Sequence, residues 1–209
     1  MSSPLFDLAF KLDLDHWIEL AGGYNLMPNT GASAKIAAAV CALPSRWLAP
    51  CKDVLQLAFG YNSSHFNSSN LNVYLSHVPA GTSIFDFGHF AQLWKAARDG
   101  QPKFVKYDYG TAGNMRLYGV PKPPEYQLHK IADGPTKLAL YSGSIDTLAD
   151  PRDVEWLVSS LGAPPLVWRK LDGYGHLDFV WGDTAAQDVY PEVIELLQSH
   201  IQVNHTLVR

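Results

Sequence analysis

Residues 137–171 read KLALYSGSIDTLADPRDVEWLVSSLGAPPLVWRKL, and this stretch decides the fold class. Lys137–Tyr141 and Leu166–Leu171 are short, mostly apolar runs with the length of strands, and between them a helix opens at Pro151. A closing helix is expected over Ala185–His200. Strand, helix, strand and helix in this order predict two parallel strands with crossover helices, which is the arrangement of a doubly wound α/β sheet.

Two parallel strands alone make an incomplete sheet. Parallel sheets occur almost only with several strands and with both faces covered, because a two-stranded fragment leaves its edges unpaired. We therefore expect one of two situations. Either another polypeptide supplies the missing strands, or these 209 residues are the C-terminal part of a longer protein.

Upstream of this unit the chain reads as a series of helices. Ser3 is the expected N-cap and Pro4 the first residue of a helix that stops at Gly22–Gly23. Two short helices and a packed loop with a helical centre are expected next, over Ser33–Leu43, Pro50–Gly60 and 66–83. The first half of the chain is thus predicted to be mostly helical.

A longer helix follows the loop. Thr82 or Ser83 would cap it, and its apolar side is predicted to consist of Phe87, Phe90, Ala91, Trp94 and Ala97. The alternation over Lys103–Tyr109 then predicts a short strand, and the Pro-rich run MRLYGVPKPPEYQLHKI, residues 115–131, predicts an irregular surface connection.

Composition excludes several classes of protein. With 47% hydrophobic and 17% charged residues the chain is globular. Its net charge of −4, without clusters of either sign, gives no support for a nucleic-acid partner. The longest purely apolar run, Ile36–Leu43, is far too short for a transmembrane segment.

The cysteines and three sequons are compatible with the secretory route. Cys41 and Cys51 are ten residues apart, and the sequons begin at Asn62, Asn67 and Asn204. Two unpaired buried thiols and chance sequons are the alternatives, and the first residues of the chain do not resemble a signal peptide. Secretion or lysosomal residence is therefore an expectation on these features alone.

Two residues after the strands are candidates for catalysis. Asp146 follows the first strand and His176 follows the second, and catalytic groups of open α/β sheets lie just beyond the carboxyl ends of strands. A loop aspartate in an Asx-turn and a structural histidine are the alternatives. Asp178 could fix the loop of His176 without touching a substrate, and Asp150 is better explained as the N-cap of the following helix.

No metal site and no cofactor is expected. His65, His77 and His89 are spaced twelve apart, and none has a second ligand at the spacing of a zinc site. The chain contains neither a dinucleotide-binding fingerprint nor a phosphate-binding loop. It also contains no Gly-x-Ser-x-Gly; Ser144 comes closest to such a nucleophile, but its neighbours do not fit.

Four stretches resemble one family closely. They are NLNVYLSHVPAGTSIFDFGHFAQLWKAARDGQPKFVKYDYG (70–110), LYGVPKPPEY (117–126), LYSGSIDTLADPRDV (140–154) and GYGHLDFVWG (173–182). Together they are similar to the acid lipases of the gastric and lysosomal type, which are α/β-hydrolases, over nearly the whole chain. Departures are Phe90, where the family usually has Trp, and the extended GQPKF.

The resemblance implies a fold, a reaction and site residues. Residues 1–107 would be the family's helical cap and lid, with Cys41 and Cys51 as its disulfide, and residues 108–209 the C-terminal part of the hydrolase core. The activity would be hydrolysis of triacylglycerol or cholesteryl ester at a lipid–water interface by a Ser-His-Asp mechanism. Asp146 and His176 match the family's acid and base.

The family's nucleophile has no matching position here, so we expect the chain on its own to be inactive. Two hypotheses follow. The chain is part of an acid lipase whose nucleophile is supplied by an N-terminal half, in cis or by another chain. Alternatively, it is a non-catalytic lipid-binding or regulatory protein derived from a lipase.

Overall fold

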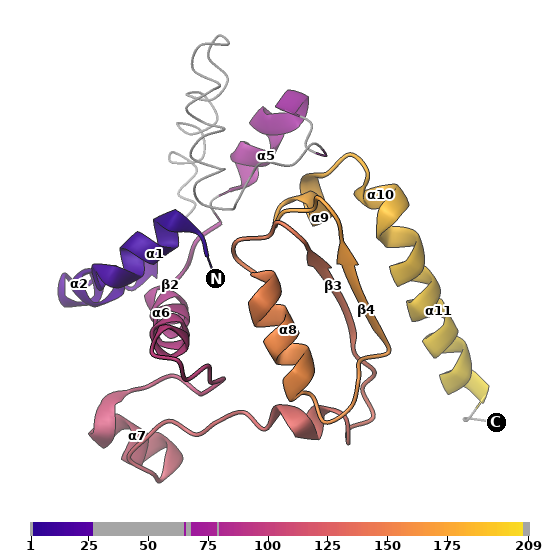
Figure 1. Ribbon diagram of the computed structural model, residues 1–209. Helices are drawn as coiled ribbons and strands as arrows, with labels where there is room; N and C mark the ends of the chain where they lie inside the picture. The colour runs from indigo at the N-terminus through magenta and orange to yellow at the C-terminus, as the bar shows by residue number, and fades with distance from the viewer. Residues whose placement is uncertain (1, 27–64, 66–67, 79, 207–209) are drawn as a thin grey trace.

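The computed structural model describes residues 2–26, 65, 68–78 and 80–206 (Figure 1). The helices expected over 33–43 and 50–60 lie outside the described residues. The same holds for Cys41, Cys51, Asn62 and Asn67, so their pairing and glycosylation stay predictions. In the described residues no helix has the length and apolarity that crossing a bilayer requires.

The C-terminal half contains the predicted β-α-β unit. Strand β3 (Ala139–Gly143) pairs in parallel with β4 (Val167–Leu171), in a register that sets Ala139 opposite Val167 and Gly143 opposite Leu171. Helix α8 (Pro151–Ser160) connects the two strands, and the Asp150 side chain caps it by accepting a hydrogen bond from the backbone N–H of Arg152. The predictions of two parallel strands and of a capping Asp150 are confirmed.

The expected closing helix is divided. Helix α10 (Ala185–Asp188) and helix α11 (Tyr190–Thr206) are separated at Val189, whose backbone is not helical. Pro191 lacks a backbone N–H, which suits the first turn of a new helix and not the interior of a long one. A single helix over Ala185–His200 was therefore wrong. The sequon residue Asn204 falls within α11.

Helices flank the small sheet on two sides. Figure 1 shows α8 along one side of β3 and β4 and α11 along the other. Leu171, Tyr174 and Val189 form a buried cluster there, against which Tyr141, Phe179 and Val193 pack. Among the described residues each of the two strands has one hydrogen-bonded neighbour, the other strand.

The N-terminal helix is also two helices. Helix α1 (Pro4–Lys11) starts at the predicted Pro4, with Ser3 at the N-cap position, and helix α2 (Leu14–Leu20) follows. Asp13 between them adopts a left-handed backbone with φ of 50°, which interrupts the regular helix. The two-residue strands β1 (Asn25–Leu26) and β2 (Thr82–Ser83) then pair antiparallel, and so join this region to the middle of the chain.

Helix α6 (Ile84–Arg98) is the long predicted helix. Ser83 caps it by accepting a hydrogen bond from the N–H of Phe85. Phe87 and Ala91 are buried and pack with Phe10 of α1. Phe90 was predicted on the same face but is 57% exposed. On the helix its side chain lies to one side of the buried stripe that contains Phe87 and Ala91.

The middle of the chain differs most from expectation. The predicted strand over Lys103–Tyr109 forms only an isolated bridge between Val105 and Glu125, and the expected irregular connection starts with a helix, α7 (Gly110–Tyr118). Asp108 accepts hydrogen bonds from the N–H of Gly110 and the amide of Asn114, which bends the chain into this helix. The remaining elements are η1 (Ser68–Asn70), α5 (Leu71–His77) and η2 (Leu128–Ile131).

Candidate active site

The two candidate catalytic residues meet at one end of the sheet. Asp146 lies in the loop after β3 and His176 in the loop after β4, and parallel pairing brings the carboxyl ends of both strands to the same edge. His176 Nδ1 and Asp146 Oδ2 are 3.0 Å apart, which is a hydrogen bond. Residues thirty positions apart in the sequence thus form an acid and base pair in space.

Asp146 is held from both sides. Its side chain is 3% exposed, and its Oδ1 accepts hydrogen bonds from the backbone N–H of Leu148 at 2.8 Å and of Ala149 at 2.9 Å. One oxygen therefore fixes the loop as an Asx-turn while the other meets the histidine. Asp146 thus forms both of the arrangements that the sequence left open, the local Asx-turn and the hydrogen bond to a histidine.

The Nδ1 nitrogen of His176 is held by Asp146, while the ring is accessible to solvent. Its side chain is 42% exposed, although its partner Asp146 is buried. A carboxylate that accepts from Nδ1–H selects the tautomer in which Nε2 carries a lone pair. Such an imidazole can take up a proton at Nε2 while its Nδ1–H stays bonded to the carboxylate.

Backbone contacts fasten the two loops to each other. The N–H of Ser144 donates to the carbonyl of Leu171, and the N–H of Ile145 donates to the carbonyl of Tyr174 at 3.1 Å. At Gly143 a Cβ atom would lie 2.1 Å from that same Tyr174 oxygen. The close approach therefore requires glycine at position 143.

Asp178 acts on the loop of His176. It is 1% exposed, and its Oδ2 accepts a hydrogen bond of 2.6 Å from the N–H of Gly175, the residue before the histidine. Helix α9 (Asp178–Trp181) begins at this aspartate. The side chain thus closes the turn that carries His176, as the sequence suggested.

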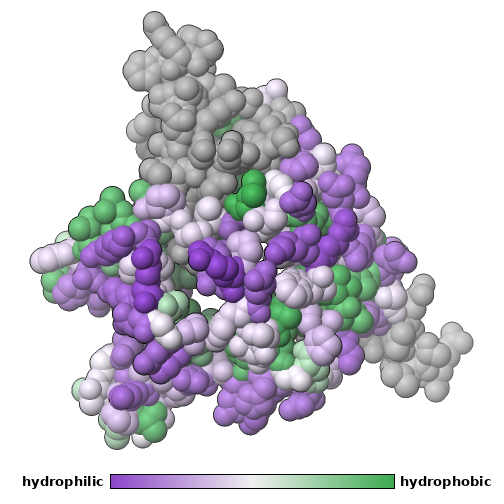
Figure 2. All heavy atoms as spheres, viewed as in Figure 1, coloured by the Kyte–Doolittle hydropathy of each residue, from purple (hydrophilic) through white to green (hydrophobic). Residues whose placement is uncertain are grey.

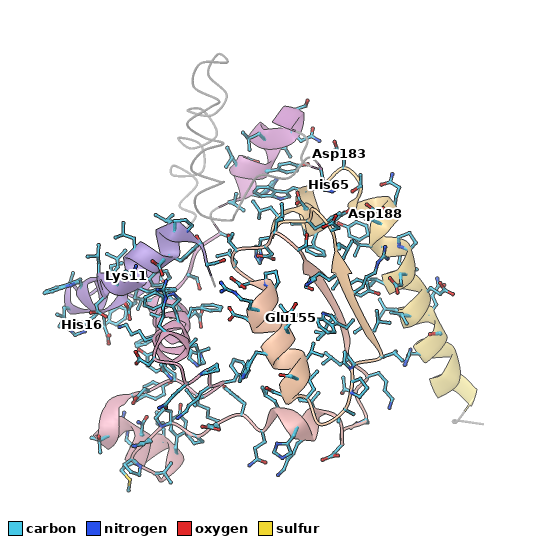
Figure 3. All side chains as sticks on the ribbon, viewed as in Figure 1. Lys11, His16, His65, Glu155, Asp183 and Asp188 are labelled. Atoms are coloured by element: carbon cyan, nitrogen blue, oxygen red, sulfur yellow. The ribbon has the colours of Figure 1, made fainter. Side chains whose placement is uncertain are left out.

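A second network anchors this loop to the first half of the chain. The Tyr174 hydroxyl bonds Thr184 Oγ1 at 2.6 Å and donates to Asp188 Oδ2 at 2.8 Å, and Thr184 Oγ1 lies 3.0 Å from His65 Nδ1. Figure 3 shows His65 beside Asp183 and Asp188 at the same end of the sheet as the candidate site. Sequence analysis missed this network, since a separation of 119 residues between His65 and Thr184 leaves no local pattern.

The network shifts the pKa values of its members. Burial raises the pKa of the Tyr174 phenol, and the hydrogen bond to Asp188 acts in the same direction. The hydrogen bond from Tyr174 lowers the pKa of the Asp188 carboxyl, with help from Thr184. The arrangement therefore favours a protonated tyrosine that donates to an ionised aspartate.

Ser144, His65 and His89, which the sequence also singled out, are hydrogen-bonded to other parts of the chain. The Ser144 hydroxyl is hydrogen-bonded to Asp172 and to the N–H of Gly173. His89 Nε2 lies 2.7 Å from the carbonyl oxygen of Val105, and His65 is part of the network above. In the part of the chain that the structure describes, no three histidine, cysteine or carboxylate side chains are grouped as metal ligands.

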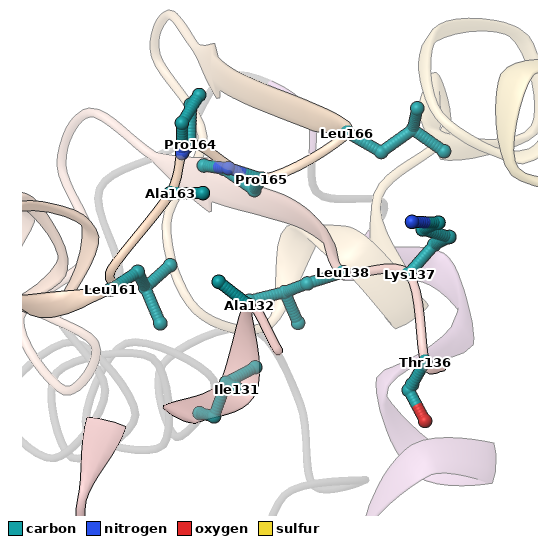
Figure 4. Close-up of a pocket in the computed structure, with 10 residues that line it drawn as sticks. All are labelled: Ile131, Ala132, Thr136, Lys137, Leu138, Leu161, Ala163, Pro164, Pro165 and Leu166. Atoms are coloured by element: carbon teal, nitrogen blue, oxygen red, sulfur yellow. The ribbon is translucent and has the colours of Figure 1, made fainter. Parts of the chain in front are cut away.

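Besides the Asp146–His176 pair, the structure contains a groove and a smaller pocket. A groove of about 770 Å³ runs between α6 and α8, and its lining includes Phe90, Trp94, Phe104, Trp156 and Leu148, the last only two residues from Asp146. A pocket of about 240 Å³ lies at the amino ends of the strands, lined by residues such as Leu138, Leu161 and Leu166 (Figure 4). The smaller pocket is thus at the opposite end of the sheet from Asp146 and His176.

Comparison with known proteins finds lipases. The chain is 34% identical over 194 residues to lipase lipl-1 of Caenorhabditis elegans, which covers 92% of this chain and 46% of that protein. It is 37% identical over 149 residues to human gastric triacylglycerol lipase, covering 70% and 35%. Over 205 residues it is 31% identical to triacylglycerol lipase 1 of Arabidopsis thaliana, covering 97% and 48%.

No family model matches the chain. The chain spans about half the length, or less, of the curated relatives it matches. These relatives imply the α/β-hydrolase fold, of which β3, α8 and β4 form one β-α-β unit. The similarity to lipases from nematode, mammal and plant agrees with the resemblance to the acid lipases that the sequence motifs carry.

Proposed function

We propose that this chain contributes the acid and the base of a lipid ester hydrolase that works by a Ser-His-Asp mechanism. The single observation that carries the proposal is the hydrogen bond of 3.0 Å between His176 and the buried Asp146, beyond the carboxyl ends of two parallel strands. The lipase relatives support the ester substrate, since two of them are named as triacylglycerol lipases.

The geometry supports defined roles for both residues. His176 would take the proton of a serine as this attacks the ester carbonyl, and would return it to the leaving alcohol. Asp146 would hold the imidazole in the required tautomer and stabilise its charged form. The serine and the oxyanion-hole groups would come from a segment outside these 209 residues, in cis or from another chain.

The remaining features of the proposed protein follow from the family. Residues 1–107 would form the helical cap and lid, with Cys41 and Cys51 joined, and residues 108–209 the C-terminal part of the core. The protein would be secreted or lysosomal, with glycans at Asn62, Asn67 or Asn204.

A lipid–water interface is the proposed place of action. Side chains of α1 and α2 support it, because Leu8, Leu12, Trp17 and Leu20 are all more than half exposed. Figure 2 shows hydrophobic side chains gathered at this end of the molecule. Exposed apolar groups of this kind, with an aromatic ring among them, suit contact with lipid.

Hydrolysis of a short-chain nitrophenyl ester tests the proposal. The native polypeptide should hydrolyse the ester, and His176→Ala should lower its turnover by about four to six orders of magnitude. His129→Ala is the matched control, because His129 is exposed on η2, far from Asp146. The pure 209-residue chain should be inactive, and hydrolysis by this chain that His176→Ala abolishes would show that it holds its own nucleophile.

A non-catalytic lipid-binding role is the second candidate, and the groove between α6 and α8 favours it. Its volume of about 770 Å³ lies in the range of small-molecule sites, and aromatic rings line it. Trp94 and Trp156 both line the groove, so dodecanoate should change tryptophan fluorescence saturably if the chain binds acyl groups. Saturable binding by a native polypeptide that hydrolyses no ester would favour this second function.

A further inference from the structure

Ser144 connects the loop of the proposed acid with the loop of the proposed base. Its Oγ accepts a hydrogen bond of 2.8 Å from the N–H of Gly173 and lies 3.1 Å from Asp172 Oδ1, to which it donates. Ser144 is two residues before Asp146, and Gly173 is three residues before His176. One hydroxyl thus bridges the two loops close to the catalytic pair.

The backbone of the second loop is shaped for this bridge. Gly173 has a φ of +70°, a left-handed conformation that glycine adopts without strain. In this conformation its N–H reaches the serine oxygen, and the chain then continues through the buried Tyr174 to His176. Only Tyr174 and Gly175 separate Gly173 from His176, so the Ser144 bridge holds this loop close to the histidine.

The hydrogen bond between Asp146 and His176 depends on where the two loops lie. Its length of 3.0 Å leaves little tolerance, because a separation larger by a few tenths of an ångström weakens a hydrogen bond and 1 Å removes it. Asp146 is fixed within its own loop by the N–H groups of Leu148 and Ala149, so contacts between the loops must set the distance to the histidine.

We propose that Ser144 is a positioning residue, which holds the loop of His176 against the loop of Asp146 and so keeps the imidazole paired with the carboxylate. The inference rests on the proposed function, since it concerns the same acid and base. Ser144, whose sequence context comes closest to that of a nucleophile, would have this positioning role instead. Its hydroxyl is engaged with Asp172 and Gly173 and fastens two loops together.

The tautomer of His176 measures this positioning without any activity assay. Nitrogen-15 NMR of the 209-residue chain at about pH 9, where histidine side chains are neutral, distinguishes Nδ1–H from Nε2–H. The wild-type chain should show mainly Nδ1–H, because Asp146 accepts from this nitrogen. Ser144→Ala should shift the ratio toward Nε2–H by about fivefold, which corresponds to the loss of one hydrogen bond.

Three further variants make the result specific. Ser144→Thr keeps the hydroxyl and should restore the wild-type ratio. Asp172→Ala removes only the acceptor, from an exposed side chain, and should shift the ratio in the same direction by about twofold. Ser159→Ala is the matched control, because the Ser159 hydroxyl bonds only the carbonyl of Trp156 within α8 and should leave the ratio unchanged.

Asp146→Asn separates the inference from the proposed function. Because two N–H groups hold Oδ1, the new amide group would face His176 as a donor and should reverse the tautomer. No change in this variant would refute the pairing itself, and the proposed function with it. If Asp146→Asn changes the ratio but Ser144→Ala and Asp172→Ala do not, the positioning role of Ser144 is wrong, even where Ser144→Ala lowers the melting temperature. If Ser144→Ala does not fold, Asp172→Ala decides alone.

Discussion

Gly143 shows at the scale of one residue why the candidate site needs its particular neighbours. It ends β3, and the carbonyl oxygen of Tyr174 lies where its Cβ would be, at 2.1 Å. The same oxygen accepts the N–H of Ile145. A side chain here would have to push the two loops apart, because backbone and not a flexible side chain stands in the way.

Gly143→Ala should therefore destabilise the protein by about 1–3 kcal/mol or more, since the clash forces the backbone to move. Urea unfolding followed by circular dichroism measures this change. Gly134→Ala is the control, because a Cβ there meets only the carbonyl of Ile131 at 3.5 Å, and it should change stability by less than about 0.5 kcal/mol. Equal effects of the two variants would contradict the close packing of the loops.

Asp150 is a second residue whose role can be read from its contacts. Burial would raise the pKa of its carboxyl, but hydrogen bonds from Ser2 and Arg152 outweigh burial and hold the pKa below its ordinary value. A carboxyl with a lowered pKa in the folded protein stabilises the fold above the unfolded pKa of about 3.9, and this stabilisation is lost as the pH falls through the folded pKa.

Asp150→Asn keeps a capping oxygen but cannot ionise. The difference in free energy of unfolding between wild type and Asp150→Asn should be present at pH 7 and shrink as the pH falls below about 4, as urea titrations at several pH values would reveal. Asp150→Ala also removes the cap and should cost about 1 kcal/mol at neutral pH. A wild-type advantage that persisted at pH 2 would argue against an ionised Asp150.

At the scale of elements, α6 shows how one helix divides its residues between core and surface. Phe87 and Ala91 are buried against Phe10 of α1, while Phe90 faces the groove, and Trp94 between them both packs on the Phe10 cluster and lines the groove. Aromatic residues occur on both sides, so hydrophobicity alone does not identify the buried one. The neighbouring helix α1 makes that choice by covering one face.

Phe87→Ala should destabilise the protein by about 3–5 kcal/mol, because it leaves a cavity among buried side chains. Phe90→Ala removes the same ring from a position that is 57% exposed and should cost less than about 0.5 kcal/mol. The pair shares one helix and one substitution, so thermal unfolding of both variants isolates the effect of burial. Similar losses of stability would mean that Phe90 is covered in solution.

At the scale of the whole molecule the described chain has two separate buried clusters. Phe10, Ile84, Phe87 and Ala91 form one between α1 and α6, and Leu171, Tyr174 and Val189 form the other beside β4. Backbone hydrogen bonds from the N–H groups of Ser2 and Ser3 to the carbonyl of Thr147 join the two regions. The proposed division into residues 1–107 and 108–209 would place one cluster in each part.

Hydrogen exchange tests whether the two clusters unfold independently. Phe87→Ala should accelerate amide exchange in α1, α2 and α6 by about a hundredfold or more and leave β3, β4 and α11 unchanged, because each cluster would open by itself. Mass spectrometry of peptides from both halves resolves this. Uniform acceleration along the chain would instead mean one cooperative unit and would contradict the two-part organisation.

The local features of this protein could be predicted from its sequence. Pro4, Ser83 and Asp150 indicate where α1, α6 and α8 start, because the preference of such residues for a helix start depends only on backbone groups within a few residues. Short apolar runs likewise indicate the two strands. The position of Asp146 and His176 after successive parallel strands also follows from local patterns. The breaks at Asp13 and Val189 were missed, since each depends on a single backbone conformation.

Only the tertiary structure decided what each of these residues contacts. The distance from Asp146 to His176, the bridge of Ser144 to Gly173, and the link of Tyr174 and Thr184 to His65 join residues between 29 and 119 positions apart. The spacing of apolar side chains shows which face of a helix or strand is apolar. It does not show which other element covers that face, so it gives no information on contacts between residues so far apart in the sequence. The sequence by itself determined the elements and the chemistry at their ends, and packing decided which of those groups meet.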